Sequence, residues 1–385
     1  MRTYLDYNAT TPVASEVAGA ISVALREQFG NPSSIHAFGQ QAKTALDEAR
    51  DRVASLLGAS ASDIVFTGGG TEGDNLALRG LSGVASASPK RHIVISAFEH
   101  EAVRVTAHAM AREGWRVTEL PVGPLGVVEP DDLGRAMQPD TAVVSVMHAN
   151  NEIGTIQPIA ELSRIAHEAR ALFHTDAVQS AGKIPVDVVA LGVDMLTVSA
   201  HKFGGPKGVG AIWIRRGISL TPILTGGRQE RGRRAGTENV PALIGLGVAA
   251  QLARERLVSA NARVRALRDR LERGILERVP GAVVNGDRDR RVPNTTNISF
   301  EAVEGESLVI ALDLEGIAVS TGSACSSGTL EPSHVLRALG LPDSRVQSAI
   351  RFSLGPPTTD AEIDRVLEAL PPAVSRLRTL GGTRR

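Results

Sequence analysis

Short apolar runs rich in β-branched residues alternate with longer amphipathic stretches through the first half of the chain, and this alternation constrains the fold most strongly. The helical stretches stop at residues typical of helix ends, since 16–29 runs up to Gly30 and 100–113 runs up to Gly114. Such alternation predicts an α/β protein with a mostly parallel sheet covered on both faces. The expected strands are 63–67, 92–96, 141–147, 173–176, 195–199 and 210–214.

The pattern changes after residue 240. Residues 240–278 are strongly helical and rich in arginine, which is typical of a long helix that joins two domains. Beyond them the pattern predicts a small α+β unit. Its expected strands are 282–285, 294–300 and 351–354, and its helices lie around 305–315, after Pro332 and at the C-terminal end. In a chain of 385 residues we predict three parts. These are an N-terminal segment that packs with the small domain (1–15), a large domain (16–255) and a small domain (256–385).

Charge and composition limit the classes of partner. The 42 basic and 42 acidic residues give a formal net charge of zero, which argues against a surface dedicated to nucleic acid or to an anionic membrane. No apolar run approaches the ~20 residues of a membrane-spanning helix, and the first residues lack the apolar stretch of a signal peptide. Because there is only one cysteine, we expect a reducing compartment, the cytoplasm.

That cysteine, Cys325, lies in a stretch of small residues, 320–328, that is poorly suited to bury a side chain. An intramolecular disulfide is impossible, so the thiol serves redox chemistry, nucleophilic attack or nothing. A lone intracellular thiol is most often inert, and only other parts of the chain can favour a reactive role.

A glycine-rich turn, 68–75, follows the first expected strand and precedes a helix. Backbone amides at such a helix start favour a phosphate, and Thr71 adds a hydroxyl donor. Gly68, Gly70 and Gly73 also satisfy the dinucleotide pattern G-x-G-x-x-G. A plain flexible turn is the competing interpretation.

Polar residues follow the other expected strands, at the edge where ligands of α/β sheets gather. His100 follows the second strand, and Asn151 follows the third. Asp176 closes a further strand, with Gln179 about one helical turn later. Taken singly, the histidine could be a surface group and the aspartate a helix cap.

The decisive segment is 199–208, in which a buried strand delivers Ser199, His201 and Lys202 into a glycine-rich loop. Burial disfavours a charged lysine, and a deprotonated lysine is a good nucleophile that forms Schiff bases. Pyridoxal phosphate demands such a lysine, an acidic partner for its ring nitrogen and a phosphate cradle. Lys202, Asp176 and the turn at Gly70 and Thr71 meet these three demands.

Taken together, these segments resemble a cysteine desulfurase of the class V pyridoxal-phosphate-dependent aminotransferase family, in its iron–sulfur-assembly and nitrogen-fixation branch. The resemblance runs from 4–12 to 350–355. It implies a transferase of fold type I, with a seven-stranded sheet in the large domain. The motifs that carry it are Ser199-Ala200-His201-Lys202, Asn150-Asn151-Glu152-Ile153-Gly154, the Asp176–Gln179 spacing, Gly236-Thr237-Glu238-Asn239 and the Cys325 segment.

The resemblance assigns roles by motif. Lys202 would hold the cofactor as a Schiff base and shuttle protons. Asp176 would pair with the ring nitrogen, and His100 would lie over the ring and assist proton transfer. Asn151 and Arg351 would bind the substrate carboxylate, for which a guanidinium is suited. The implied cofactor-binding residues are Gly70, Thr71, Asn151, Asp176, Gln179 (to the ring oxygen), Ser199, His201, Lys202 and Thr237.

Thr237 would reach the phosphate of the neighbouring subunit, which implies a homodimer. One departure from the family pattern is visible, because Gly70 and Gly73 stand where small non-glycine residues are common. It puts no role in doubt.

The implied reaction converts L-cysteine to L-alanine and leaves the sulfur on Cys325 as a persulfide, for an acceptor such as an iron–sulfur scaffold protein. Cys325 is also a candidate transient ligand of a cluster shared with that partner. Three alternatives stay open. They are a selenocysteine lyase or aminotransferase in which Cys325 is dispensable, a dehydrogenase that uses the glycine turn, and a non-catalytic scaffold.

Overall fold

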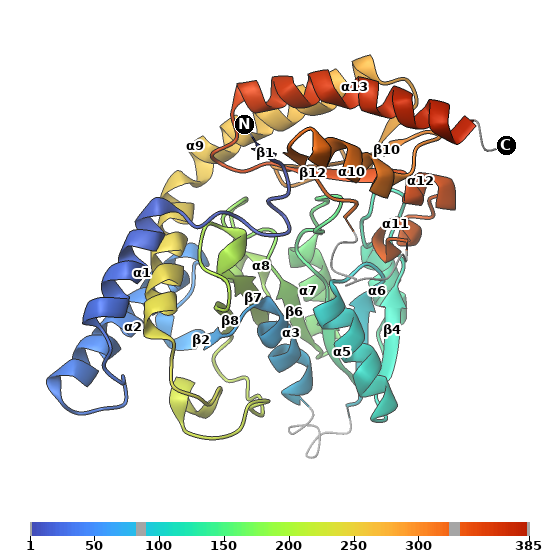
Figure 1. Cartoon of the computed structure of the whole chain (residues 1–385). Helices are drawn as coiled ribbons and strands as arrows, with labels where there is room; N and C mark the ends of the chain where they lie inside the picture. Colours follow the sequence, from blue (N-terminus) through green and yellow to red (C-terminus); the bar gives the residue numbers. More distant parts are fainter. Residues whose placement is uncertain (1, 82–89, 323–331, 383–385) are drawn as a thin grey trace.

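The computed structural model describes residues 2–81, 90–322 and 332–382, and its elements form a large α/β unit beneath a smaller α+β unit (Figure 1). The large unit is built on a seven-stranded sheet with the order β2-β8-β7-β6-β5-β3-β4. Only β8 runs antiparallel to its neighbours, so the predicted mostly parallel sheet is confirmed. The strands are β2 (Ile64–Thr67), β3 (His92–Ser96), β4 (Arg116–Leu120), β5 (Thr141–Ser145), β6 (Leu172–Asp176), β7 (Met195–Ser199) and β8 (Gly210–Ile214).

Both faces of this sheet are buried, as the apolar runs require. Within β3, Val94 packs in one apolar core, whereas Ile93 and Ile95 pack in another on the opposite face. Helices and short 3-10 turns supply the covering layers. They are α1 (Ser15–Glu27), α2 (Ala37–Leu56), η1 (Ala61–Asp63), α3 (Gly70–Arg79), α5 (Glu101–Arg112), α6 (Pro130–Ala136), α7 (Ile159–Glu168), α8 (Val188–Leu191), η2 (Ala200–Lys202) and η3 (Gln229–Gly232).

The sequence did not predict β4, which pairs with β3 at the edge of the sheet. Arg116 and Glu119 in β4 are exposed, so this strand lacks the continuous apolar run of its neighbours. An edge strand has only one paired neighbour, and its side chains face solvent more. Its pattern is therefore weak.

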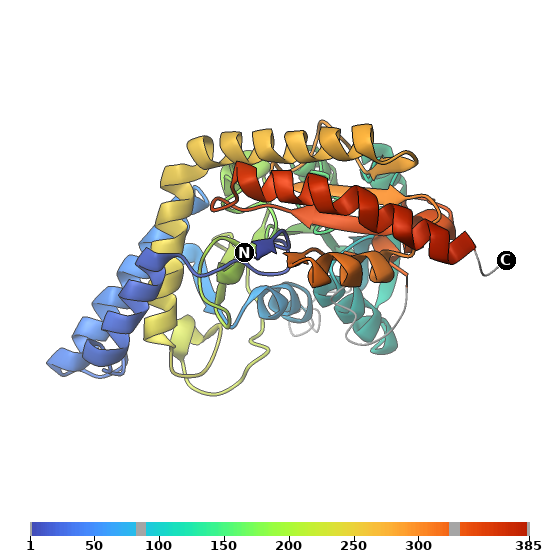
Figure 2. The same cartoon turned by 45° about the horizontal axis from the view of Figure 1, so that its top comes forward.

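The long helix α9 (Val240–Arg278) serves two apolar cores. Leu243 and Leu246 in its first half belong to the core of the large unit, whereas Leu267 and Leu271 in its second half belong to the core of the small one. Figure 2 shows the helix bending between these two limbs, the first beside α1 and α2 and the second beside α13 (Asp360–Gly382). The predicted boundary between 255 and 256 falls inside this helix, and the division into domains stays a prediction.

The small unit contains a three-stranded antiparallel sheet with the order β12-β10-β9. The N-terminal strand β1 (Thr3–Tyr4) pairs in parallel with β11 (Ile317–Ala318) of this unit. The first residues of the chain therefore contact the small unit and lead from it to α1. The remaining elements are β9 (Ala282–Asn285), β10 (Thr295–Phe300), α10 (Gly305–Leu314), α11 (His334–Ala338), α12 (Asp343–Gln347) and β12 (Ala349–Ser353).

Candidate active site

The predicted site residues gather at one edge of the large sheet. Strands β2, β6 and β7 run in the same direction, so their carboxyl ends meet at this edge. Asp176 ends β6, and Ser199 ends β7 and leads directly into η2, where His201 and Lys202 lie. Proximity here is a result of parallel pairing, which brings strand ends together from distant parts of the sequence.

Asp176 lies within electrostatic range of both His100 and Lys202. Burial raises the pKa of its carboxyl, and the charges of His100 and then of Lys202 act in the opposite direction. The Asp176 Oδ1 atom accepts a hydrogen bond of 2.8 Å from the amide of Val178. The structure therefore brings together the three residues expected to act on the ring of a cofactor.

His100 is also the N-cap of α5, where its Nδ1 accepts a hydrogen bond of 3.1 Å from the amide of Ala102. This contact fixes the imidazole at the start of the helix. From the sequence alone, His100 could equally have been a surface residue; the structure holds it at the edge of the sheet.

The amine of Lys202 contacts the N-terminal segment. Its Nζ donates to the carbonyl oxygen of Asn8 at 2.6 Å and to that of Ala9 at 2.9 Å. The same segment contacts the backbone of His201, whose carbonyl oxygen accepts from the hydroxyl of Thr11. Residues 8–11 therefore form one wall of the site, beside the lysine.

A cavity of about 690 Å³ lies at the start of α3. Gly69, Gly70, Thr71, Ser199 and His201 are among the residues that line it. The first amides of a helix have no partner within the helix, and the helix dipole is positive at this end. The cavity therefore suits a phosphate group, as the glycine-rich turn predicts.

The two unexpected glycines of the turn let α3 approach the sheet closely. A Cβ atom on Gly73 would lie 2.6 Å from Cγ2 of Thr197, and one on Gly70 would lie 2.9 Å from Cγ2 of Val178. Gly69 has a φ of +152°, which side chains rarely adopt. Larger side chains at Gly70 and Gly73 would therefore clash with Val178 and Thr197.

His201 lines the cavity in its neutral form. Burial lowers the pKa of its imidazole to about 4, and the charges of Lys202, Lys207 and Lys183 act in the same direction. Its Nδ1 lies 3.2 Å from the hydroxyl of Thr10. A neutral imidazole at this position offers one N–H to an anion while it keeps its contact with the N-terminal segment.

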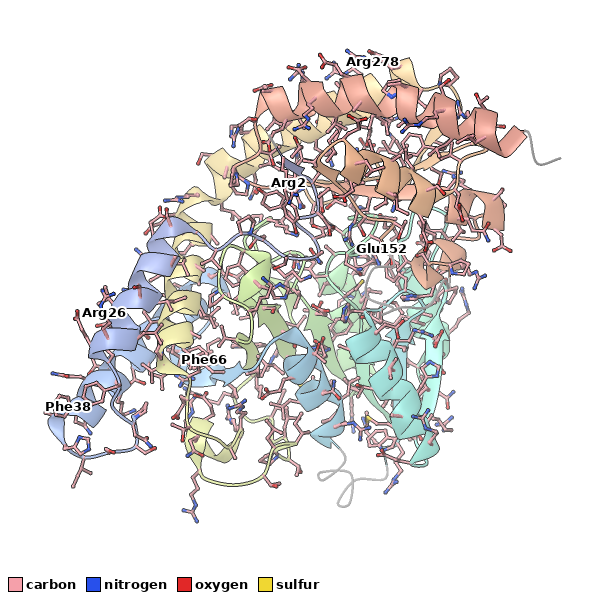
Figure 3. The ribbon with its side chains drawn as sticks, in the orientation of Figure 1. Arg2, Arg26, Phe38, Phe66, Glu152 and Arg278 are labelled. Carbon is pink, nitrogen blue, oxygen red and sulfur yellow. The ribbon has the colours of Figure 1, made fainter. Side chains whose placement is uncertain are left out.

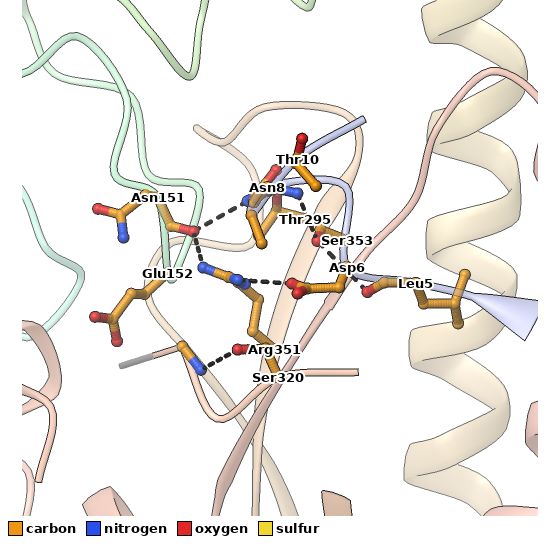
Figure 4. A network of polar contacts seen from close by, with 12 residues as sticks. Leu5, Asp6, Asn8, Thr10, Asn151, Glu152, Thr295, Ser320, Arg351 and Ser353 are labelled. Atoms are coloured by element: carbon orange, nitrogen blue, oxygen red, sulfur yellow. Dashed lines mark hydrogen bonds and ion pairs between the residues drawn. The ribbon is translucent and has the colours of Figure 1, made fainter. Parts of the chain in front are cut away.

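Arg351 lies on β12 of the small unit and reaches the same site (Figure 4). Its Nη1 donates to the carbonyl oxygen of Asn151 at 3.0 Å, and its Nη2 pairs with Oδ1 of Asp6 at 2.7 Å. The Nε atom is buried and has no hydrogen-bond partner among the described residues. This guanidinium therefore has hydrogen-bonding capacity that the described residues leave unused.

Asn8 is a connecting residue that the sequence reasoning missed. Its side-chain nitrogen donates to the carbonyl oxygen of Asn151 at 3.0 Å and to the hydroxyl of Thr295 at 2.8 Å (Figure 4). The only sequence signal for it was its place in the first stretch of the family resemblance, 4–12. Nothing in that stretch alone indicates contacts with residues from both units.

Two further buried acids surround Asp176 and were also missed. Burial raises the pKa of Glu99 to about 8, and the charge of Asp176 adds to this increase. Burial also raises the pKa of Asp74 well above its usual value, with Asp176 as the next cause. Shifted acids of this kind cluster at functional sites. Of the three carboxyls, Asp176 has the nearby cations that favour its ionised form.

Thr237 lies apart from these residues. It is exposed, in the segment that follows η3, and it does not line the cavity at α3. The segment is nevertheless tied to the glycine turn, because Nε of Arg234 pairs with Oε1 of Glu72 at 2.9 Å. Cys325 lies outside the described residues.

Residues 2–81, 90–322 and 332–382 contain no group of three or more His, Cys, Asp or Glu side chains placed to hold a metal ion. The same residues include no helix that is both long enough and apolar enough to cross a membrane. The predicted role of Cys325 as a transient cluster ligand stays a prediction. The described site thus contains an amine, a buried carboxyl and a cavity suited to an anion.

Comparisons with known proteins show the family of the chain. The family model Aminotransferase class-V matches residues 3–366. Cysteine desulfurase IscS of Dictyoglomus turgidum is 50% identical over 377 residues, which cover 98% of this chain and 95% of that protein. A cysteine desulfurase of Gluconacetobacter diazotrophicus is 51% identical over 379 residues, or 98% of this chain and 94% of that one.

Among solved structures, a NifS-like protein superposes with a TM-score of 0.92 and 39% identity, and the match covers 98% of this chain and 100% of that chain. Fold, site and sequence thus define one class of protein. The chain belongs to the aminotransferase class-V family, and within that family to the cysteine desulfurases.

Proposed function

We propose that this chain binds pyridoxal phosphate and converts L-cysteine to L-alanine, with the sulfur carried on Cys325 as a persulfide. One observation supports this proposal above the others. The amine of Lys202 and the carboxyl of Asp176 stand at neighbouring strand ends, within electrostatic range of each other and beside a glycine-lined cavity. Few cofactors demand an amine, an acid and an anion site together.

The residues present fit the cofactor. Gly70, Thr71, Ser199 and His201 line a cavity whose open space lies against the first amides of α3, and they would hold the phosphate. Asp176 would face the ring nitrogen, and Lys202 would bond to the aldehyde carbon. When bound, pyridoxal phosphate supplies an electron sink for the carbon atoms of the amino acid substrate.

The other residues of the site orient the substrate and move its protons. Arg351 would bind the carboxylate through its guanidinium, which Asp6 and the carbonyl of Asn151 orient. His100 lies close enough to Asp176 to influence its carboxyl, and it would assist proton transfer to or from the bound substrate. Lys202 would accept and return the α-proton of the substrate.

Sulfur transfer needs the thiolate of Cys325, because a thiol is a poor nucleophile. The Cys325 sulfur would form a bond to the substrate sulfur as the carbon–sulfur bond breaks. The electron pair of the broken bond stays with the carbon, which takes up a proton and leaves as part of alanine. The step balances without an external oxidant or reductant.

We also propose a homodimer. The corner formed by α1 and α2 exposes Phe29, Ile35 and Phe38, with 71%, 95% and 54% of each residue accessible. The rings of Phe29 and Phe38 lie 5.1 Å apart, and Figure 3 shows Phe38 at the far end of this corner. Such a cluster on the surface is typical of an interface. A second copy on this side would also give the exposed Thr237 a partner, the phosphate of the other subunit.

The proposed sulfur acceptor is a protein, such as an iron–sulfur scaffold, and the proposed compartment is the cytoplasm. The zero net charge supports the exclusion of nucleic acid as a direct partner. The deciding experiment measures alanine and sulfide produced from L-cysteine, with and without a reductant, by the wild type and by Cys325→Ala. Equal sulfide release by both proteins would contradict the proposal.

A further inference from the structure

Lys183 is a buried lysine for which the proposed mechanism has no use. It is 8% exposed and lines, together with Lys202, a cavity of about 410 Å³ between the N-terminal segment and α9. No salt bridge to Lys183 occurs among the described residues. Burial lowers the pKa of its amine well below the usual value, and Lys202 and Arg351 act in the same direction. Because burying an amine without an opposite charge costs free energy, the burial of Lys183 requires an explanation.

The partners of Lys183 are two side-chain amides. Its Nζ donates to Oδ1 of Asn8 at 2.9 Å and to Oε1 of Gln179 at 2.6 Å. A lysine amine presents N–H donors whether or not it is protonated, whereas an amide has an oxygen end and a nitrogen end. Because Nζ donates in both contacts, both amides turn their oxygen atoms toward Lys183 and their nitrogen atoms away from it.

The orientation of Gln179 matters for the site. Its Nε2 donates to the carbonyl oxygen of Asn8 at 3.0 Å, the same oxygen that accepts from Nζ of Lys202 at 2.6 Å. A reversed amide would place the Gln179 oxygen against this carbonyl oxygen, and two acceptors would face each other. With the observed orientation, Gln179 keeps a second N–H for the ring oxygen of the cofactor.

The orientation of Asn8 has a similar effect. With its oxygen on Lys183, its nitrogen reaches the carbonyl of Asn151 and the hydroxyl of Thr295. The backbone of Asn8 is thereby fixed at the point where it accepts from Lys202. The amine of Lys183 thus contacts the amide oxygens of both Gln179 and Asn8, and both of these residues lie beside Lys202.

We propose that Lys183 is a positioning residue, which fixes the amides of Gln179 and Asn8 so that Gln179 donates to the ring oxygen of the cofactor and Lys202 keeps its place. This inference rests on the proposed function, since it concerns the residues that would hold pyridoxal phosphate. Lys183 itself need not touch the cofactor.

The chain offers a matched control. Nδ2 of Asn294 also donates to Oδ1 of Asn8, at 2.9 Å. Asn294→Ala therefore removes one of the two donors to Oδ1 of Asn8 and leaves the contact between Lys183 and Gln179 intact. If the substitutions only made the N-terminal segment less ordered, Asn294→Ala and the Lys183 variants would lose cofactor affinity equally. If amide orientation matters, the Lys183 variants would lose more affinity.

The experiment is a double-mutant cycle on cofactor affinity. Pyridoxal phosphate is titrated into the cofactor-free wild type, Lys183→Met, Gln179→Ala and the double variant, and the visible absorbance is followed. Loss of one hydrogen bond in a buried site weakens binding by about tenfold. We expect this loss in each single variant, no further loss in the double variant, and a change within about twofold in Asn294→Ala.

Two results would overturn the inference. One is an affinity of Lys183→Met equal to that of the wild type. The other is a double variant about a hundredfold weaker, the product of two independent tenfold effects. Thermal unfolding of each cofactor-free protein checks that it is folded.

If Lys183→Met does not fold, Lys183→Gln takes its place, because its amide can accept as well as donate and so does not fix the neighbouring amides. Wild-type affinity in folded Lys183→Gln overturns the inference too. Failure of the wild type to bind the cofactor through Lys202 would instead contradict the proposed function.

Discussion

Nη2 of Arg351 pairs with Oδ1 of Asp6 at 2.7 Å, across 345 positions of sequence. The arginine side chain is 3% exposed and that of the aspartate 18%. The strand that supplies Arg351 belongs to the small unit, whereas Asp6 lies in the segment that leads to the large one. The residue expected to bind substrate is therefore held by the N-terminal segment before any substrate arrives.

We expect Asp6→Ala to raise the KM for L-cysteine by roughly tenfold, the effect of losing one charge-assisted hydrogen bond. The kcat should change by no more than a few-fold, because Asp6 orients the guanidinium and does not contact the reacting sulfur. Steady-state kinetics of alanine formation check this expectation. An unchanged KM would mean that Asn151 alone positions Arg351.

Replacement of Lys202 by alanine should remove the visible absorbance that pyridoxal phosphate gives when it is bonded to a lysine. The substitution deletes the amine in η2, directly after β7, and Lys183 is occupied by two amides. Absorbance spectra of the purified protein provide the measurement. A yellow Lys202→Ala protein would identify another lysine as the attachment site.

Cys325→Ala should lower sulfide production by roughly 10³-fold or more, because the nucleophile of the transfer step is lost. Its visible absorbance should match that of the wild type, since the cofactor residues are intact. Because the chain has a single cysteine, a thiol-specific reagent that labels the wild type and not the variant reports on this residue alone.

The contribution of Glu99 to the stability of the cofactor-free protein should fall as pH rises from about 4.5 to about 8. Its pKa is raised to about 8 in the folded protein from 4.5, so its contribution is complete below 4.5 and is lost as pH rises toward the folded value. Over this range the contribution amounts to a few kcal/mol, at roughly 1.4 kcal/mol per pKa unit.

Glu99→Gln should therefore make the change in stability between pH 5 and pH 8 more favourable than in the wild type, because the amide does not ionise. Chemical unfolding at the two pH values measures this difference. Glu161→Gln, at an exposed position of α7, is the control and should show the same change as the wild type. A change in Glu99→Gln equal to that of the wild type would show that Glu99 ionises freely.

The segment that carries Thr237 is anchored by a buried ion pair. Nη1 and Nη2 of Arg50 each donate to a carboxylate oxygen of Glu230 at 2.7 Å, and Glu230 also accepts from the amide of Phe66. Removing one partner of a buried pair leaves the other charge uncompensated and costs about 3–5 kcal/mol. We expect Glu230→Ala to reduce the free energy of unfolding by this amount.

The matched control is Glu113→Ala, which breaks the exposed pair between Arg79 and Glu113. An exposed pair contributes about 0–1 kcal/mol, so denaturant unfolding should show little change. Equal effects of the two substitutions would mean that burial of the Arg50–Glu230 pair does not matter. Glu230 and Arg231 also have φ values of +46° and +58°. Side chains rarely adopt such values, so the surrounding contacts must stabilise this segment.

Much of the fold could be predicted because its signals are local. Each buried strand has its own apolar run, and each helix has its own stop, so strand ends could be located before their neighbours were known. The edge strand β4 was not predicted, because a partly exposed strand has no continuous apolar run. The candidate residues Asp176, Ser199 and Lys202 could be found because a polar residue directly after a buried strand stands out.

The sequence by itself therefore determined the glycine turn, the lone thiol, the family to which they point, and the residues that end β2, β3, β6, β7 and β8. The tertiary structure alone decided which of these residues meet. It joined Asp6 to Arg351, and it placed Asn8 among Gln179, Lys183 and Lys202. The physical reason is that hydrogen bonds and ion pairs between residues more than a hundred positions apart have no local pattern. They arise only when packing of the two units brings the N-terminal segment across the edge of the sheet.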